Sequence, residues 1–85
     1  MTTETRILGI MIKNRQQNIL KVQDTFTKFG CSIRTRLGIN VSRDYHIEDA
    51  GLILLELSGD IAEMEKLENA LKQFEGVEVH KMVFA

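Results

Sequence analysis

The chain has 85 residues, and its 11 basic and 12 acidic side chains give a formal net charge of -1. A chain of this length is expected to form a single domain, residues 1–85. The near-neutral charge argues against direct binding to nucleic acid, because such modules usually carry a clear basic excess. The single cysteine excludes an intrachain disulfide. Together with the polar first residues and the lack of a run of about 20 apolar residues, it predicts a cytoplasmic protein without a membrane segment.

The first strand is predicted over residues 6–12, where apolar side chains fall on both alternating faces. One face carries Ile7 and Met11, and the other carries Leu8, Ile10 and Ile12. A half-solvated strand alternates polar and apolar residues, so this strand should be central, with both faces covered.

A helix is predicted over residues 15–29, with Asn14 as its N-cap and Gln17 completing a capping box. Apolar residues recur on one face of this helix at steps of three and four. They are Ile19, Val22, Phe26 and Phe29.

Residues 31–39 have the pattern of a half-exposed edge strand. The apolar face is predicted to hold Cys31, Ile33, Thr35, Leu37 and Ile39. Arg34 and Arg36 are two positions apart, so both should lie on the opposite face. Two guanidinium groups on one face can bind a carboxylate or a phosphate. The other interpretation is that they pair with acids such as Glu56 or are solvated.

A connection over residues 40–51 follows, which is long for a hairpin and holds Tyr45 and His46. Long loops on a rigid scaffold are frequent sites of function.

A third strand is predicted over 52–57, again apolar on both faces, and a second helix over 61–74 with Asp60 as its N-cap. The last strand is predicted over 77–84.

The order strand–helix–strand–strand–helix–strand is that of the ferredoxin-like βαββαβ sandwich, an α+β fold. Right-handed crossovers place the first and third strands in the middle, giving the antiparallel order 4-1-3-2 with both helices on one face. The helix-free face then carries apolar side chains. A large apolar patch is seldom left in water, so a homodimer or a higher homo-oligomer is predicted, formed through this face or an edge of the sheet.

The sequence contains no catalytic signature and no metal-binding motif such as CxxC or HxxxH. No enzyme activity, cofactor or metal ion is therefore expected. The two central strands also lack the aromatic side chains with which RNA-recognition motifs of this strand order stack bases.

Three short runs carry a resemblance to a known family: residues 33–38 (IRTRLG), 52–60 (LILLELSGD) and 76–84 (GVEVHKMVF). The chain resembles the ACT-like family of iron-only hydrogenase system regulators over almost its whole length. The resemblance implies a stand-alone ferredoxin-like module that forms oligomers. ACT domains bind amino acids near the turn after the first strand, which often contains Asp-Arg-Pro-Gly. Here the turn reads IKNRQQ over residues 12–17, without the proline or the glycine.

These observations favour a homo-oligomeric regulatory module that binds a small ligand or a protein partner. The alternatives are a small dimeric α/β-sandwich enzyme, with His46 or His80 as general base in a pocket between sheet and helices, and a purely structural assembly subunit. The residues predicted to bind the ligand or partner are Asn14, Arg15, Arg34, Arg36, Tyr45 and His46.

Overall fold

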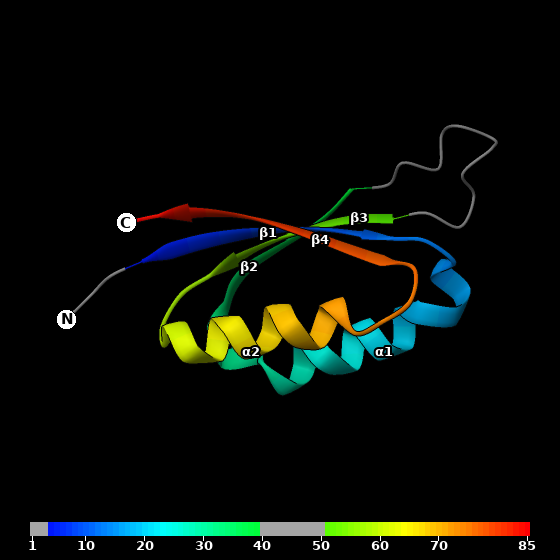
Figure 1. The fold of residues 1–85 in the computed structure, drawn as a ribbon, viewed down its shortest axis with the longest axis horizontal. Helices are drawn as coiled ribbons and strands as arrows, with labels where there is room; N and C mark the ends of the chain where they lie inside the picture. The colour runs from blue at the N-terminus through cyan, green and yellow to red at the C-terminus, as the bar shows by residue number, and fades with distance from the viewer. Residues whose placement is uncertain (1–3, 40–50) are drawn as a thin grey trace.

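The computed structural model describes residues 4–39 and 51–85, which form an antiparallel sheet with two helices on one of its faces (Figure 1). The strands are β1 (Thr5–Ile12), β2 (Ile33–Ile39), β3 (Gly51–Leu57) and β4 (Val77–Phe84), and the helices are α1 (Arg15–Lys28) and α2 (Ile61–Lys72). The strands lie in the order β2-β3-β1-β4. The ferredoxin-like α+β fold and the strand order that the sequence predicted are therefore confirmed.

A buried apolar layer fills the space between the sheet and the helices. Alternate residues of the central strands face the helices, and each helix contributes one apolar stripe, as the spacing predicted. Fully burying a leucine or isoleucine side chain contributes roughly 1.5–3 kcal/mol, so this layer holds the helices on the sheet. Its members are Leu8, Ile10, Ile12, Val22, Phe26, Ile53, Leu55, Leu57, Met64, Leu67 and Leu71.

Strand β2 departs from the predicted pattern because its pairing with β3 is irregular between Ile33 and Thr35. Cys31 lies outside the strand, exposed in a short 3-10 turn over Gly30–Ser32. Ile33 pairs with Leu57 on the helix side of the sheet, whereas Thr35 pairs with Glu56 on the other side.

This β-bulge moves every later residue of β2 to the face opposite the predicted one, since an extra residue reverses the two-residue alternation. Leu37 and Ile39 therefore lie on the helix-free face. Arg36 pairs with Leu55 and lies on the helix side, so the prediction that Ile33, Leu37 and Ile39 share one face was wrong.

The start of α1 also differs from the prediction. Asn14 adopts a left-handed conformation, with φ 53 and ψ 54, and its side chain makes no capping hydrogen bond. An N-cap side chain reaches the first helical amides from an extended backbone, so the left-handed conformation rules out the predicted capping box. The carbonyl of Asn14 instead accepts from the amides of Gln17 and Asn18, at 2.9 and 3.2 Å.

Asn18 joins two turns at one end of the sheet. Its side-chain amide donates to the carbonyl of Lys13 at 3.0 Å and to the carbonyl of Glu75 at 2.9 Å. The amide of Lys13 also donates to the carbonyl of Gly76 at 2.7 Å. Gly76 has φ 84, and a Cβ there would lie 3.1 Å from both the Asn18 amide and the Lys13 carbonyl, so only glycine fits without strain. We call these bonds the Asn18 clamp.

Helix α2 begins as predicted, because the side chain of Asp60 accepts from the amide of Ala62 at 2.9 Å. Farther along the helix, the buried Glu68 binds Lys72 at 2.8 Å and Lys81 of β4 at 3.3 Å. Burial alone would raise the pKa of Glu68, but the hydrogen bonds and charges of the two lysines outweigh it and hold this pKa below its usual value.

Glu68→Gln is expected to lower the free energy of unfolding at pH 7. It should also reduce the amount by which this free energy falls between pH 7 and pH 3. Because the folded pKa of Glu68 is depressed, its ionised form stabilises the fold above the unfolded pKa of about 4.3. That contribution is lost as the pH falls through the folded value. Urea unfolding between pH 7 and pH 3 should therefore show the variant losing roughly 1–3 kcal/mol at pH 7 and approaching wild type in acid.

Glu65→Gln is the matched control, since Glu65 is an exposed acid of the same helix. If Glu65→Gln and Glu68→Gln changed the profile equally, the buried contacts of Glu68 would have no special role.

Neither helix of the part of the chain that the structure describes is long and apolar enough to cross a membrane.

Candidate functional site

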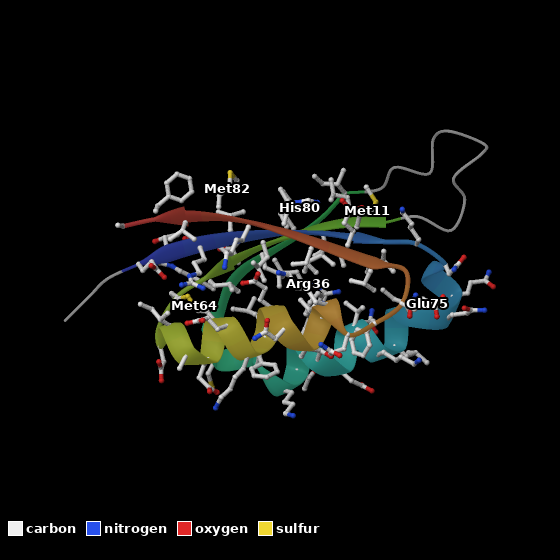
Figure 2. All side chains as sticks on the ribbon, in the orientation of Figure 1. Met11, Arg36, Met64, Glu75, His80 and Met82 are labelled. Carbon is white, nitrogen blue, oxygen red and sulfur yellow. The ribbon has the colours of Figure 1, made fainter. Side chains whose placement is uncertain are left out.

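The face of the sheet that carries no helix is lined mainly by apolar side chains. Figure 2 shows Met11, His80 and Met82 on this side of the sheet, whereas Met64 and Arg36 lie on the helix side. We call this surface the open face. The strand pairing assigns to it Thr5, Ile7, Gly9, Met11, Thr35, Leu37, Ile39, Leu52, Leu54, Glu56, Glu78, His80, Met82 and Phe84.

The open face exposes large apolar side chains to solvent. Leu37, Met82 and Phe84 are exposed by 53%, 55% and 56%, and Ile39 by 38%. Apart from the exposed Thr5, the open-face residues of the central strands are half-buried by their neighbours. Two features of the sequence had predicted this face: both central strands are apolar on both sides, and only one side can be covered by helices.

Polar groups lie toward the two outer strands of the open face. Thr35 of β2 donates to the carboxylate of Glu56 at 2.7 Å. On β4, Nε2 of His80 lies 2.6 Å from a carboxylate oxygen of Glu78. The hydrogen bond and charge of His80 lower the pKa of Glu78 from its usual value. The open face therefore combines exposed apolar side chains on β2 and β4, half-buried apolar side chains on β1 and β3, and two polar pairs.

Asn14, one of the predicted binding residues, lies in the turn between β1 and α1, and Arg15, another, is the first residue of α1. The Asn18 clamp holds this turn against the turn before β4 through three hydrogen bonds. The starts of β3 and β4 lie at the same end of the sheet, because Ile12 pairs with Gly51 on one side and with Val77 on the other.

Arg36 covers an aromatic ring on the helix side of β2. Its guanidinium carbon lies 5.0 Å from the centre of the Phe26 ring, a cation–π distance. Arg34 is exposed and lies in the irregular stretch between Ile33 and Thr35. Both arginines are exposed and belong to β2, the outer strand of the sheet.

The predicted binding residues do not form one cluster within the described part of a single chain. Asn14 follows Ile12, at one end of the central strand β1, whereas Arg34 follows Ile33, whose partner Leu57 pairs with Arg6 at the other end. Six residues of strand separate these ends, which is about 20 Å. Tyr45 and His46 lie outside the described residues.

A largely buried ion pair between Arg6 and Glu4 was not predicted from the sequence. Arg6 is 8% exposed, and its Nε lies 2.6 Å from the carboxylate of Glu4, whose side chain is 18% exposed. One terminal nitrogen of Arg6 is buried without a hydrogen-bond partner. The sequence predicted Arg6 as the first residue of the first strand, and its charge gave no indication that the side chain would be buried.

The described residues offer little for catalysis or metal binding. Within residues 4–39 and 51–85, no group of three or more His, Cys, Asp or Glu side chains is placed to hold a metal ion. His80, one of the two candidate bases, lies on the open face with its side chain 77% exposed. The dimeric-enzyme alternative required a base between the sheet and the helices, and His80 does not meet that requirement.

No protein-family model matches the chain, and no curated protein matches it. Solved structures do resemble it. An uncharacterized protein of Thermotoga maritima, TM1266, superposes with a TM-score of 0.85 at 25% sequence identity, covering 99% of this chain and 100% of its own.

Proteins described as PII-like regulators also share the fold. The apo form of CPII, a nitrogen regulatory PII-like protein of Thiomonas intermedia K12, gives a TM-score of 0.56 at 17% identity, covering 95% of this chain and 91% of its own. CPII bound to ADP, AMP and acetate gives 0.52 at 14% identity, covering 100% and 93%. These matches include an uncharacterized protein and regulatory proteins.

Proposed function

We propose that this protein is a cytoplasmic regulatory module that self-associates, as a dimer first, through the sheet and binds a small ligand or a protein partner. The observation that carries the proposal is the open face, where four large apolar side chains are each exposed by more than a third. Contiguous apolar surface of this kind marks an interaction site more often than a solvated surface.

Self-association would also supply stability that a short chain lacks. A domain of this size buries roughly 60–65% of the surface that its unfolded chain exposes, and its stability margin is correspondingly small. Covering the open face would remove further apolar area from water, at roughly 25 cal/mol for each Å².

The proposed ligand sites are the residues that the sequence predicted: Asn14, Arg15, Arg34, Arg36, Tyr45 and His46. The four of them that the structure describes are separated along the sheet into two contact areas, one at the β1–α1 turn and one at the β2 edge. Because CPII shares the fold and has been seen with ADP and AMP, adenine nucleotides are the first ligands to test. A role in the iron-only hydrogenase system is proposed from the sequence resemblance alone.

Sedimentation velocity across a range of protein concentrations tests the self-association. We expect a dimer or a larger oligomer that dissociates on dilution. A monomer at every concentration would contradict the proposal. Native mass spectrometry of the same sample would reveal a co-purified small molecule as an added mass on the oligomer.

Arg34→Ala is expected to weaken the binding of ADP or AMP, measured by titration calorimetry, with almost no change in melting temperature. Arg36→Ala should weaken binding too, but it also removes the cation over Phe26, worth about 0.5–1 kcal/mol at an exposed site. Its melting temperature should therefore fall by roughly 2–8 °C. Lys66→Ala, which removes an exposed lysine paired with Glu63 on α2, is the control for general loss of positive charge.

If Arg34→Ala bound both nucleotides like wild type but melted much lower, Arg34 would belong to the structure and not to a binding site. If wild type bound neither nucleotide, the adenine nucleotide would be the wrong ligand class.

A further inference from the structure

We infer that Gly9 is the contact point for a second copy of this chain, packed face to face on the open face so that Leu54 of each copy fills the space above Gly9 of the other. This inference rests on the proposed self-association and specifies its surface and register. The occupant of the open face is thus a second copy and not an unrelated partner.

Nothing within one chain requires glycine at position 9. Gly9 is not among the glycines with positive φ, and its pairing with both neighbouring strands is regular. A Cβ at this position would meet Leu54 Cδ2 at 3.7 Å and the His80 carbonyl at 3.9 Å, which are ordinary contacts. Glycine inside a strand costs roughly 0.5–1 kcal/mol relative to alanine. In the absence of a bulge or a strained backbone, it often marks close approach by another group.

On the open face, a glycine without a side chain lies beside a large leucine side chain. Gly9 of β1 pairs with Leu54 of β3, and these are the two central strands. A two-fold interface requires one patch to match itself. A two-fold axis parallel to the strands, between β1 and β3, places each Leu54 over the partner's Gly9. An axis across the strands would instead stack leucine on leucine and glycine on glycine, leaving a clash and a void.

The size of the open face suits a second copy. Four strands spaced about 4.8 Å apart, each seven residues long at about 3.4 Å per residue, give a flat footprint of about 450 Å² for each copy. Two copies contribute about 900 Å², just below the roughly 1,000 Å² that a specific interface needs, and the side chains that stand above the sheet add the remaining area. Aligned packing of two such sheets is a common arrangement, with an angle near -30° between them.

The same axis predicts which outer residues meet. β2 of one copy lies over β4 of the other, so Leu37 faces the partner's His80 and Thr35 faces the partner's Met82. Under the alternative axis, across the strands, Leu37 would face Leu37 of the partner. The two arrangements therefore differ in a way that a cross-linker can detect.

Gly9→Val tests the contact because it fills the space above position 9 with a side chain that suits a strand. We expect the dissociation constant of the dimer, measured by sedimentation equilibrium, to rise at least about tenfold, while the melting temperature of the dilute monomer stays equal or rises. Gly38→Val is the matched control. Gly38 is another strand glycine, and a Cβ there would have no atom within 4 Å. It pairs with Ile53 on the helix side of the sheet, so a side chain at this position would not enter the inferred interface.

The outcomes separate this inference from the proposed function. If Gly9→Val associates like wild type while Leu54→Asp is monomeric, the open face is the interface but the contact at Gly9 is wrong. If both variants associate like wild type, the chain self-associates through another surface; the inference and the proposed use of the open face then fail, while self-association itself stands. If the wild-type protein is a monomer, both the inference and the proposed self-association are wrong.

Cross-linking tests the axis. In a Cys31→Ser background, Leu37→Cys and His80→Cys chains are mixed with a bis-maleimide whose reach matches the spacing of about 10 Å between packed sheets. Covalent dimers containing one chain of each kind are expected. Dimers formed by Leu37→Cys alone, with no mixed product, would overturn the inferred axis.

Discussion

Asn18→Asp is expected to lower the free energy of unfolding by roughly 3–5 kcal/mol, although the two side chains have nearly the same shape. Asn18 is 5% exposed, and its amide donates to the carbonyls of Lys13 and Glu75. A carboxylate cannot donate, so the variant places a buried negative charge beside two carbonyl oxygens. Urea unfolding at pH 7, followed by circular dichroism, measures the loss.

The loss should shrink in acid, since a protonated carboxyl regains one donor. Asn69→Asp is the control for the same chemical change at an exposed position on α2. It should stay within about 0.5 kcal/mol of wild type. Equal losses for the two variants would mean that the Asn18 clamp does not stabilise the fold.

Leu55→Asp should abolish folding, with the loss of helical circular dichroism at 25 °C. Leu55 is fully buried in the core that joins the sheet to the helices. An unpaired carboxylate there costs several kcal/mol, of the same order as the total stability of a small domain. A folded variant with the wild-type spectrum would contradict the assignment of this face to the core.

Leu54→Asp is the paired experiment, one residue away on the opposite face of β3. Its protomer should fold with the wild-type spectrum and sediment as a monomer, because the charge falls at the centre of the open face. The two neighbouring leucines thus separate folding from assembly.

The sequence predicted most of the fold correctly because three of its elements carry strong local patterns. β1 and β3 are apolar on both faces, and α2 has an N-cap that the structure confirms at Asp60. β2 was the exception. A one-residue bulge leaves almost no trace in the composition of a strand, yet it reverses the side on which each later residue lies. Leu37 and Ile39 were therefore predicted on the wrong face.

The error at Asn14 has a different origin. The capping-box pattern is a local signal, and asparagine also tolerates the left-handed conformation that it adopts here. The hydrogen bonds that decide the turn come from Asn18 and from Gly76, which is 63 positions away from Lys13 in the chain. No local pattern predicts such a partner.

The sequence predicted that an apolar open face exists, but not which residues on it are important. Two doubly apolar strands in a sheet with helices on one side require an apolar open face, and this reasoning needs no coordinates. Nothing in the local sequence distinguishes Gly9 from any other single glycine in a strand. Its meaning depends on what lies around it, namely Leu54 on one side and His80 on the other.

The Asn18 clamp also bears on the order in which the protein assembles. It joins atoms 57 positions apart, from the first helix to the turn before the last strand. Closing so long a loop costs chain entropy before any contact compensates it, so this end of the sheet should form late. The amide of Lys13 should then exchange with deuterium only when β4 detaches. A chain still lacking its last eleven residues, which include Glu75 and Gly76, would leave the β1–α1 turn without these hydrogen-bond partners.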